Sequence, residues 1–135
     1  MLMGRHTYEF FAAAFPHETG EYGAKVNEIP KYVFSNTLNQ ADWGNSSIIK
    51  GDVATEAGKL KSQAVSDLVI YSHSLLAQTW LRHHLLDELK LWIHPCLVGQ
   101  GKLLFREGAK TKLKLIAQKA LATGVVIATY RPVTS

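Results

Sequence analysis

The segment Leu2-Met3-Gly4-Arg5-His6-Thr7-Tyr8-Glu9 decides the fold that we expect for this chain. Residues 1–3 are apolar and predict the end of a buried strand. A helix follows directly, and Thr7 is its expected N-terminal cap. The apolar side chains of this helix recur at helical spacing: Tyr8, Phe11, Ala12 and Phe15. A strand that leads straight into a helix is typical of an α/β protein with a parallel sheet.

The same junction holds the first candidate binding site. In an open parallel sheet, ligands bind beyond the carboxyl ends of the strands. A helix that begins there presents free backbone N–H groups, which attract phosphate. Gly4 lets a ligand approach the backbone, Arg5 can pair with a phosphate and Thr7 can donate its hydroxyl group. These residues can equally form an ordinary helix cap, and spacing alone favours that simpler interpretation.

Two more polar segments follow predicted strands. Ser35-Asn36-Thr37-Leu38 ends a strand at 31–35 and suits a phosphate, a ribose or simply a turn. Ser72-His73-Ser74-Leu75 stands between a short strand at 68–71 and the next helix, which is again a position where anions bind. Three such strand ends in one sheet favour a ligand of nucleotide size.

The remainder of the chain continues the alternation of strands and helices. Residues 17–29 are polar and predict a loop, and a strand at 48–50 precedes a helix that Asp52 caps. A half-covered strand is expected at 88–95, and strands at 113–117 and 125–130 predict an antiparallel C-terminal pair. The fold class is therefore α/β, with a mostly parallel sheet, helices on both faces and one domain over 1–135.

Composition excludes several classes of protein. The 135 residues are 47% hydrophobic and 19% charged, which is typical of one folded domain with its own core. No apolar run suits a membrane helix and no signal sequence is visible, so we expect a cytoplasmic protein without a membrane partner. The single cysteine, Cys96, excludes an internal disulfide, and the six histidines show no spacing typical of a metal site.

The chain is mildly basic, with fifteen lysines and arginines against eleven acidic residues. The densest basic stretch contains Lys110, Lys112 and Lys114, with Lys119 beyond it. Its lysines alternate with leucines, which predicts the solvent-exposed face of a strand rather than a nucleic-acid site. We therefore do not expect nucleic acid as a partner from the sequence pattern.

Several segments, taken together, resemble one family. They are residues 2–9, 31–38, 49–52, 87–95, 99–105 and 124–132. In this order they resemble the dihydrofolate-reductase-like family, and within it the C-terminal reductase domain of riboflavin-biosynthesis deaminase-reductases. The likeness covers nearly the whole chain. It implies a reductase that transfers hydride from NADPH to a small heterocyclic or carbonyl-type substrate.

The resemblance also implies where the cofactor and the substrate bind. The residues implied for the cofactor phosphates are Gly4, Arg5 and Thr7. Those implied for the adenosine ribose and its 2′-phosphate are Ser35, Asn36, Thr37 and Leu38. The pyrophosphate is implied to lie on the turn Ser72-His73-Ser74-Leu75, and Tyr8 and Phe11 are implied to face the substrate.

Two departures from the family pattern allow another interpretation. The family has a glycine-rich turn where this chain has Ser72-His73-Ser74, and side chains there hinder a phosphate, although a protonated His73 could pair with one. The first strand and helix of the family are absent before the first motif. The alternative is a catalytically degenerate protein of the same fold that dimerises or binds a ligand. Without that strand, either the strands expected at 68–71 and 88–95 close on each other, or a second chain supplies the missing edge, or this chain is a fragment. An unpaired apolar strand edge favours association, so we expect a homodimer.

Overall fold

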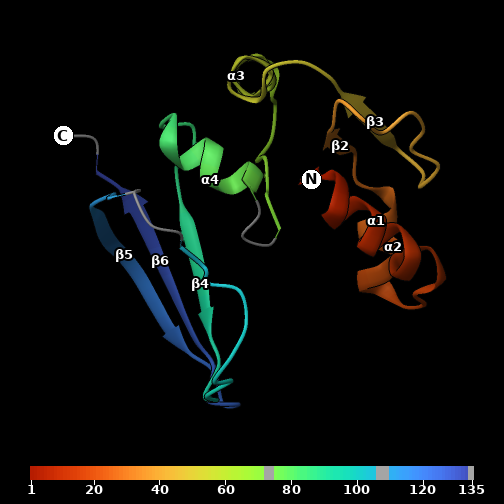
Figure 1. Ribbon diagram of the computed structural model, residues 1–135. Coiled ribbons are helices and arrows are strands. Elements are labelled where there is room, and N and C mark those ends of the chain that lie inside the picture. Colours follow the sequence, from red (N-terminus) through yellow and green to blue (C-terminus); the bar gives the residue numbers. More distant parts are fainter. Residues whose placement is uncertain (72–74, 106–109, 134–135) are drawn as a thin grey trace. The chain divides into compact units, whose positions relative to one another are not determined.

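A computed structural model describes residues 1–71, 75–105 and 110–133 of the chain (Figure 1). The chain divides into two compact units, Met1–Trp80 and Leu81–Ser135. The first unit contains a three-stranded parallel sheet and the second a three-stranded antiparallel sheet. The predicted α/β class with a C-terminal antiparallel pair is confirmed.

The parallel sheet has the strand order β1-β2-β3. Its strands are β1 (Leu2–Gly4), β2 (Lys31–Phe34) and β3 (Ser46–Ile49). Gly4 pairs with Phe34, which in turn pairs with Ile49, so the carboxyl ends of all three strands lie along one edge.

The segment 68–71 is not the full strand that its apolar residues predict. Ile70 forms one isolated bridge with Leu2, and the backbone N–H of Leu2 donates to the carbonyl of Val69 at 2.8 Å. Val69 and Tyr71 are exposed large hydrophobic residues. The segment therefore lacks the burial that would hold a longer strand against β1.

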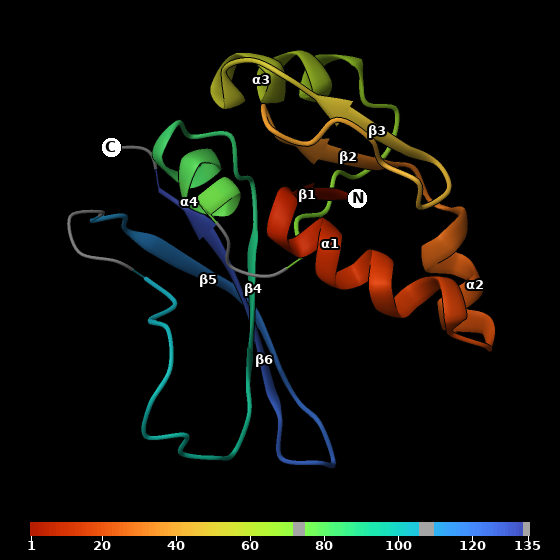
Figure 2. The same ribbon diagram turned by 45° about the vertical axis from the view of Figure 1, so that its right-hand side comes forward.

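Helices cover both faces of the parallel sheet (Figure 2). The helices α1 (Arg5–Ala14) and α2 (Glu21–Glu28), joined by the 3₁₀ turn η1 (Phe15–His17), lie on one face. The core on that face is a cluster of buried residues: Met1, Met3, Tyr8, Val26, Val33 and Trp43. The helix α3 (Val53–Gln63) lies on the other face, with Ala57 fully buried.

Two expectations about these helices are wrong. Residues 21–28 form α2 rather than part of a loop, because Gly23 and Val26 are buried three positions apart on an otherwise polar helix. A Cβ on Gly23 would lie 2.8 Å from the Cβ of Glu18, so only glycine allows this close packing. The cap of α1 is Gly4 rather than Thr7, because the helix begins directly where the extended backbone of β1 ends.

The cap predicted for the second expected helix is confirmed. The carboxylate of Asp52 accepts hydrogen bonds from the backbone N–H and the hydroxyl group of Thr55, each at 2.9 Å. Asp52 therefore satisfies one of the free N–H groups at the start of α3.

The antiparallel sheet has the strand order β4-β6-β5. Its strands are β4 (Leu89–Ile93), β5 (Leu113–Ala120) and β6 (Val126–Pro132). The strand predicted at 88–95 thus joins the C-terminal pair, with β6 at the centre. The helix α4 (Leu75–Arg82) precedes this sheet in the chain.

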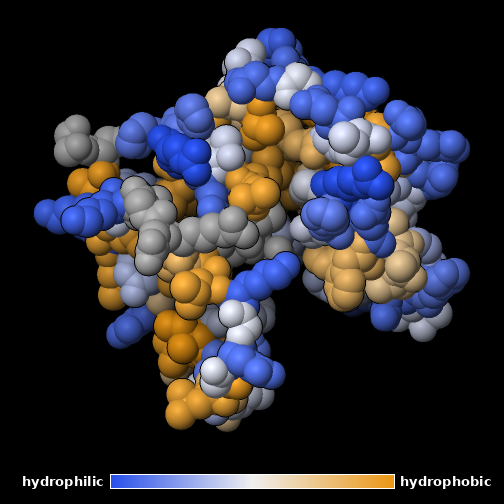
Figure 3. Space-filling view, in the orientation of Figure 1, coloured by the Kyte–Doolittle hydropathy of each residue, from blue (hydrophilic) through white to orange (hydrophobic). Residues whose placement is uncertain are grey.

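Large hydrophobic side chains reach the surface of the second unit after β4, in the lower part of Figure 3. Leu97 is fully exposed, and Val98 and Leu103 are more than three-quarters exposed. Isolated exposed leucines are common on proteins, but a group of them marks a surface that is favourable to cover. In the part of the chain that the structure describes, no helix is long and apolar enough to cross a membrane.

Candidate functional site

The parallel sheet brings two of the predicted segments together at one edge. Gly4 ends β1 and Arg5 begins α1, whereas Ser35 follows β2, the strand next to β1. The Nη1 atom of Arg5 donates to Oγ1 of Thr37 at 3.0 Å, although 32 positions separate the two residues in the chain. The two segments therefore form one continuous polar edge.

Ser35 and Asn36 hold the loop that carries Thr37. The Oγ atom of Ser35 accepts from the backbone N–H groups of Thr37 at 3.2 Å and of Leu38 at 3.0 Å. The Oδ1 atom of Asn36 accepts from the backbone N–H of Gly51 at 2.8 Å, which ties this loop to the end of β3. The structure thus gives Ser35 and Asn36 a turn-forming role and leaves Thr37 on the exposed side with Arg5.

The beginning of α1 leaves room for a ligand. No side chain caps this helix and no acidic residue lies in its first turn, so nothing there offsets the positive end of the helix dipole. A Cβ on Gly4 would contact no atom within 4 Å, and its φ of −84° is open to any residue. The chain itself therefore gives no steric reason for glycine here, and the open space suits a group that approaches the backbone.

Arg5 is held in place from two sides. Its Nε atom donates to Oε1 of Glu9 at 2.7 Å, one helical turn further along α1, while Nη1 contacts Thr37. A guanidinium group has five N–H donors, and these two contacts use one on Nε and one on Nη1. The contacts fix the orientation of Arg5 and leave donors for a phosphate.

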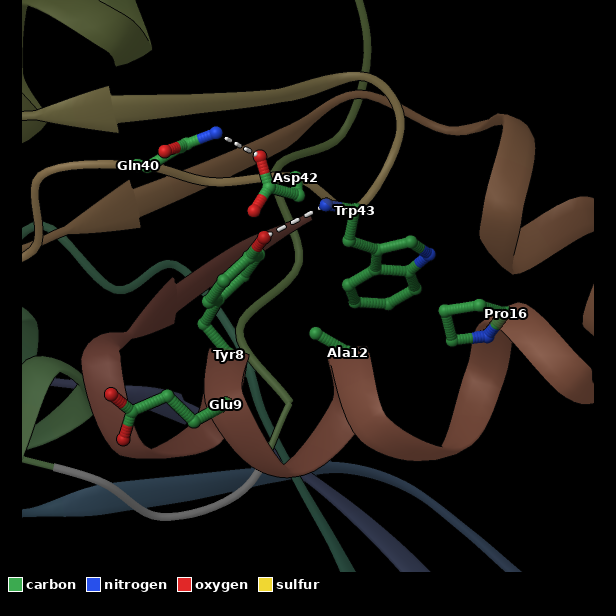
Figure 4. Close-up of a pocket in the computed structure, with 7 residues that line it drawn as sticks. All are labelled: Tyr8, Glu9, Ala12, Pro16, Gln40, Asp42 and Trp43. Atoms are coloured by element: carbon green, nitrogen blue, oxygen red, sulfur yellow. Dashed lines mark hydrogen bonds between the residues drawn. The ribbon is translucent and has the colours of Figure 1, made fainter.

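Glu9 also lines a cavity of about 370 Å³ (Figure 4). Its walls come from α1, the start of η1 and the loop before β3: Tyr8, Glu9, Ala12, Pro16, Gln40, Asp42 and Trp43. The hydroxyl group of Tyr8 accepts from the backbone N–H of Trp43 at 2.9 Å, and Nε2 of Gln40 donates to Oδ1 of Asp42 at 2.6 Å. The cavity thus combines an aromatic wall with two carboxylates.

Sequence reasoning did not find this cavity. Trp43 is part of the buried core, and its ring stacks on Phe15 with centroids 5.9 Å apart. What the pattern does not show is that residues 39–45 fold back over α1 and bring Asp42 close to Tyr8. The one available signal is an Asp-Trp pair in an otherwise polar loop.

The other predicted site residues lie as follows. Tyr8 is 5% exposed and belongs to the core, although its ring also reaches the cavity. Phe11 is half-buried against that core, in edge contact with Phe15. Leu75 is the first residue of α4 and is 67% exposed. The turn Ser72-His73-Ser74 lies outside the described residues.

Among residues 1–71, 75–105 and 110–133, no group of three or more histidine, cysteine, aspartate or glutamate side chains could hold a metal ion. The free thiol of Cys96 is exposed.

Comparison with known proteins identifies the family. The family model of the RibD C-terminal domain matches residues 1–127. The chain belongs to the RibD C-terminal domain family. The resemblance inferred from the sequence motifs is confirmed, and the fold is that of a reductase-like family.

The RibD C-terminal domain assignment agrees with individual relatives. The uncharacterized protein YyaP of Bacillus subtilis is 30% identical, and the match covers 96% of this chain and 72% of that protein. A putative riboflavin biosynthesis protein from Shewanella sp. PV-4 superposes with a TM-score of 0.79 at 23% identity, over 98% of this chain and 73% of the other.

A second solved structure supports the same fold. A pyrimidine reductase-like protein from Corynebacterium diphtheriae superposes with a TM-score of 0.68 at 11% identity. The match covers 99% of this chain and 75% of that one. At these identities the two structures establish the fold of the RibD C-terminal domain and not the substrate.

Proposed function

We propose that this protein is an NADPH-dependent reductase that transfers a hydride to a small heterocyclic or carbonyl-type substrate. The observation that carries the proposal is the contact of Arg5 with Thr37, which joins the ends of two parallel strands into one phosphate-sized polar edge. Membership of a reductase-like family supports the reaction class.

The residues of this edge divide the work of binding. The free N–H groups at the start of α1, beside Gly4, bind phosphate oxygens, and Arg5 pairs with one of them. Thr37 and its loop, held by Ser35 and Asn36, lie by the 2′-phosphate and ribose, with Leu38 alongside. Thr7 adds its hydroxyl group from the first turn of α1.

The remaining predicted residues complete the proposal. Ser72-His73-Ser74 and Leu75 bind the pyrophosphate, and Tyr8 and Phe11 face the substrate. When bound, NADPH supplies the hydride, and the protein positions the substrate against the nicotinamide ring. The cavity beside Tyr8 offers carboxylates to N–H groups of a heterocycle, and Glu9 connects it to Arg5.

Calorimetric titration with NADPH and NADH tests this proposal. We expect NADPH to bind in the micromolar range, and Arg5→Ala to weaken it by roughly tenfold or more, since a hydrogen bond to a charged group contributes about 1.5–3 kcal/mol. Thr37→Val should narrow the preference for NADPH over NADH. Lys25→Ala, on the exposed side of α2, removes the same charge elsewhere and should change nothing.

If neither nucleotide binds, the proposal is wrong and the catalytically degenerate protein becomes the better interpretation. If NADPH binds but is not oxidised with candidate heterocyclic or carbonyl substrates, the site is a nucleotide site without turnover. Where NADPH binds, Arg5→Ala separates a specific site from a weak general attraction of anions.

We also propose a homodimer. The exposed side chains of Leu97, Val98 and Leu103 support it, because covering them in water is favourable. Size-exclusion chromatography with light scattering should give twice the monomer mass for the unaltered protein and the monomer mass for Leu103→Asp. A monomer in the unaltered protein would refute this.

Two further expectations belong to this proposal. The family model spans both compact units, which supports one domain over residues 1–127 at least, so urea should unfold the chain in one transition. The exposed free thiol of Cys96 fits a reducing compartment, which supports a cytoplasmic location.

A further inference from the structure

The two units of the chain differ strongly in charge. Residues 81–135 contain nine lysines and arginines against three acidic residues, whereas residues 1–80 contain six against eight. The positive charge of the protein is therefore concentrated in the unit that contains the antiparallel sheet. An asymmetry of this kind points to a polyanionic partner.

The register of the antiparallel sheet gathers part of this charge on one face. Residues directly opposite each other in a sheet point to the same face. Ile127 in β6 pairs with Trp92 on one side and with Lys119 on the other, and Thr129 pairs with Lys90. Because side chains alternate along a strand, residues 127, 129 and 131 of β6 share this face.

A β-bulge in β5 adds Lys114 to the same face. Lys114 and Lys119 are five positions apart, so in a regular strand they would point to opposite faces. Leu115 pairs with Tyr130 and Ala117 with Thr129, which leaves Ile116 as the extra residue and reverses the alternation. Lys114 therefore pairs with Arg131 and lies on the face that holds Lys119.

We name this surface the basic face, defined by Lys90, Trp92, Lys114, Lys119 and Arg131. The three lysines are exposed, Trp92 is 62% exposed, and the side chain of Arg131 is 60% exposed. Arg131 lies at the acidic end of this face: Glu88 is 3.4 Å from its guanidinium group, and Asp87 lines a cavity together with Arg131. The opposite face of the sheet is apolar, with Leu89, Leu91 and the buried Ala128.

We propose that the basic face binds single-stranded nucleic acid. The lysines and Arg131 contact phosphates, and the exposed indole of Trp92, two residues along β4 from Lys90, stacks on a base. Every base offers a π face, so this arrangement requires no particular sequence. Two other polyanionic partners fit less well. An acidic protein segment would pair with the lysines and Arg131 but has no base to stack on Trp92. In a duplex the faces of the bases are stacked on one another and cannot contact the indole.

The proposal goes beyond the reductase and does not depend on it. The cofactor residues assigned to β1, α1 and the loop after β2 belong to the first unit, and the basic face belongs to the second. Loss of one activity therefore leaves the other measurable.

Fluorescence anisotropy of a labelled twelve-nucleotide oligo(dT) or oligo(U) tests the proposal on the full chain. We expect the affinity to fall with potassium chloride with a log–log slope of about −2 to −3, since each phosphate neutralised on a single strand contributes about −0.7. Lys90→Ala should make this slope shallower by about 0.7.

Trp92→Ala should weaken binding by roughly fivefold or more without changing the slope, because stacking involves no counterion. Lys25→Ala, an exposed lysine of the first unit, is the matched control and should leave affinity and slope unchanged. Circular dichroism of each variant establishes that these exposed substitutions leave the fold intact.

Three results would overturn the proposal. The first is no salt-dependent binding of either oligonucleotide. The second is equal behaviour of Lys90→Ala, Trp92→Ala and the Lys25→Ala control. The third is competition by poly-glutamate, or by a duplex of equal length, as strong as that of the unlabelled single strand, which would make the basic face a general anion surface.

Discussion

Lys31 is the most buried charged residue in the described part of the chain, with 0% exposure. Its Nζ atom donates to the carbonyl oxygens of Asn27 at 2.7 Å, Ile29 at 3.0 Å and Gly44 at 2.9 Å. It also lies 4.4 Å from the centre of the Trp43 ring. One ammonium group thus joins the end of α2 to the loop before β3. We predict that Lys31→Met, which keeps the chain length and removes the charge, destabilises the protein.

The size of the effect follows from these contacts. Lys31→Met leaves three carbonyl oxygens without the donor that they have in the native protein, and each buried acceptor left unpaired costs about 1–3 kcal/mol, so the gross loss is roughly 3–9 kcal/mol. Removing an ammonium group from water opposes this by several kcal/mol. The net loss expected for Lys31→Met is about 3 kcal/mol, which is a large fraction of the roughly 5–15 kcal/mol that stabilises most proteins.

Urea denaturation followed by far-ultraviolet circular dichroism measures this loss directly. The control is Lys25→Met, which removes an exposed lysine from the same region and should shift the unfolding free energy by less than about 0.5 kcal/mol. If Lys31→Met were as stable as the unaltered protein, the apolar methionine would replace the ammonium group without cost. The assignment of Lys31 as the tie between α2 and the loop would then be wrong.

Three further predictions concern neighbouring parts of the fold. Burial lowers the pKa of Lys31 below its ordinary value of 10.5, so between the native and the unfolded pKa the unfolded chain binds more protons than the native one. The difference in unfolding free energy between the unaltered protein and Lys31→Met should therefore widen between pH 7 and pH 10 in urea titrations. A difference that narrows as the pH rises would contradict this. Asp52→Ala removes the acceptor of both Thr55 hydrogen bonds and should cost about 1 kcal/mol in the same assay, whereas Asp52→Asn should recover most of the loss. Tyr8→Phe leaves the buried backbone N–H of Trp43 without its acceptor and should lower the unfolding free energy by about 1–3 kcal/mol; an unchanged value would show that this N–H finds another partner.

The elements that the sequence predicts correctly depend on local signals. β2 has alternating β-branched and aromatic residues, and Asp52 stands directly before a helical pattern. The elements that it misses depend on contacts distant in the chain. α2 is polar on most of its surface and is helical because Val26 is buried in the core and Gly23 packs closely against Glu18.

The basic face shows a different limit of sequence reasoning. Period-two alternation predicts which residues of β5 share a face only while the strand is regular. The bulge at Ile116 reverses the alternation, and the residue types around it give no sequence signal for a bulge. Lys114 and Lys119 therefore meet on one face only once the pairing with β6 is known, and a nucleic-acid surface could not be predicted from their spacing.

The candidate cofactor edge and the cavity differ in the same way. Parallel strands end at one edge of their sheet, so a sequence that shows polar segments after β1 and β2 already predicts that Arg5 and Thr37 lie near each other. The cavity depends instead on the path of a loop, which no periodicity fixes. Glu9 joins the two because one helical turn separates it from Arg5, and its carboxylate both pairs with that guanidinium group and lines the cavity. Helical spacing alone places Glu9 beside Arg5 of the cofactor edge. The position of Asp42 and Trp43 next to α1, which makes Glu9 part of a cavity as well, is known only from the structure.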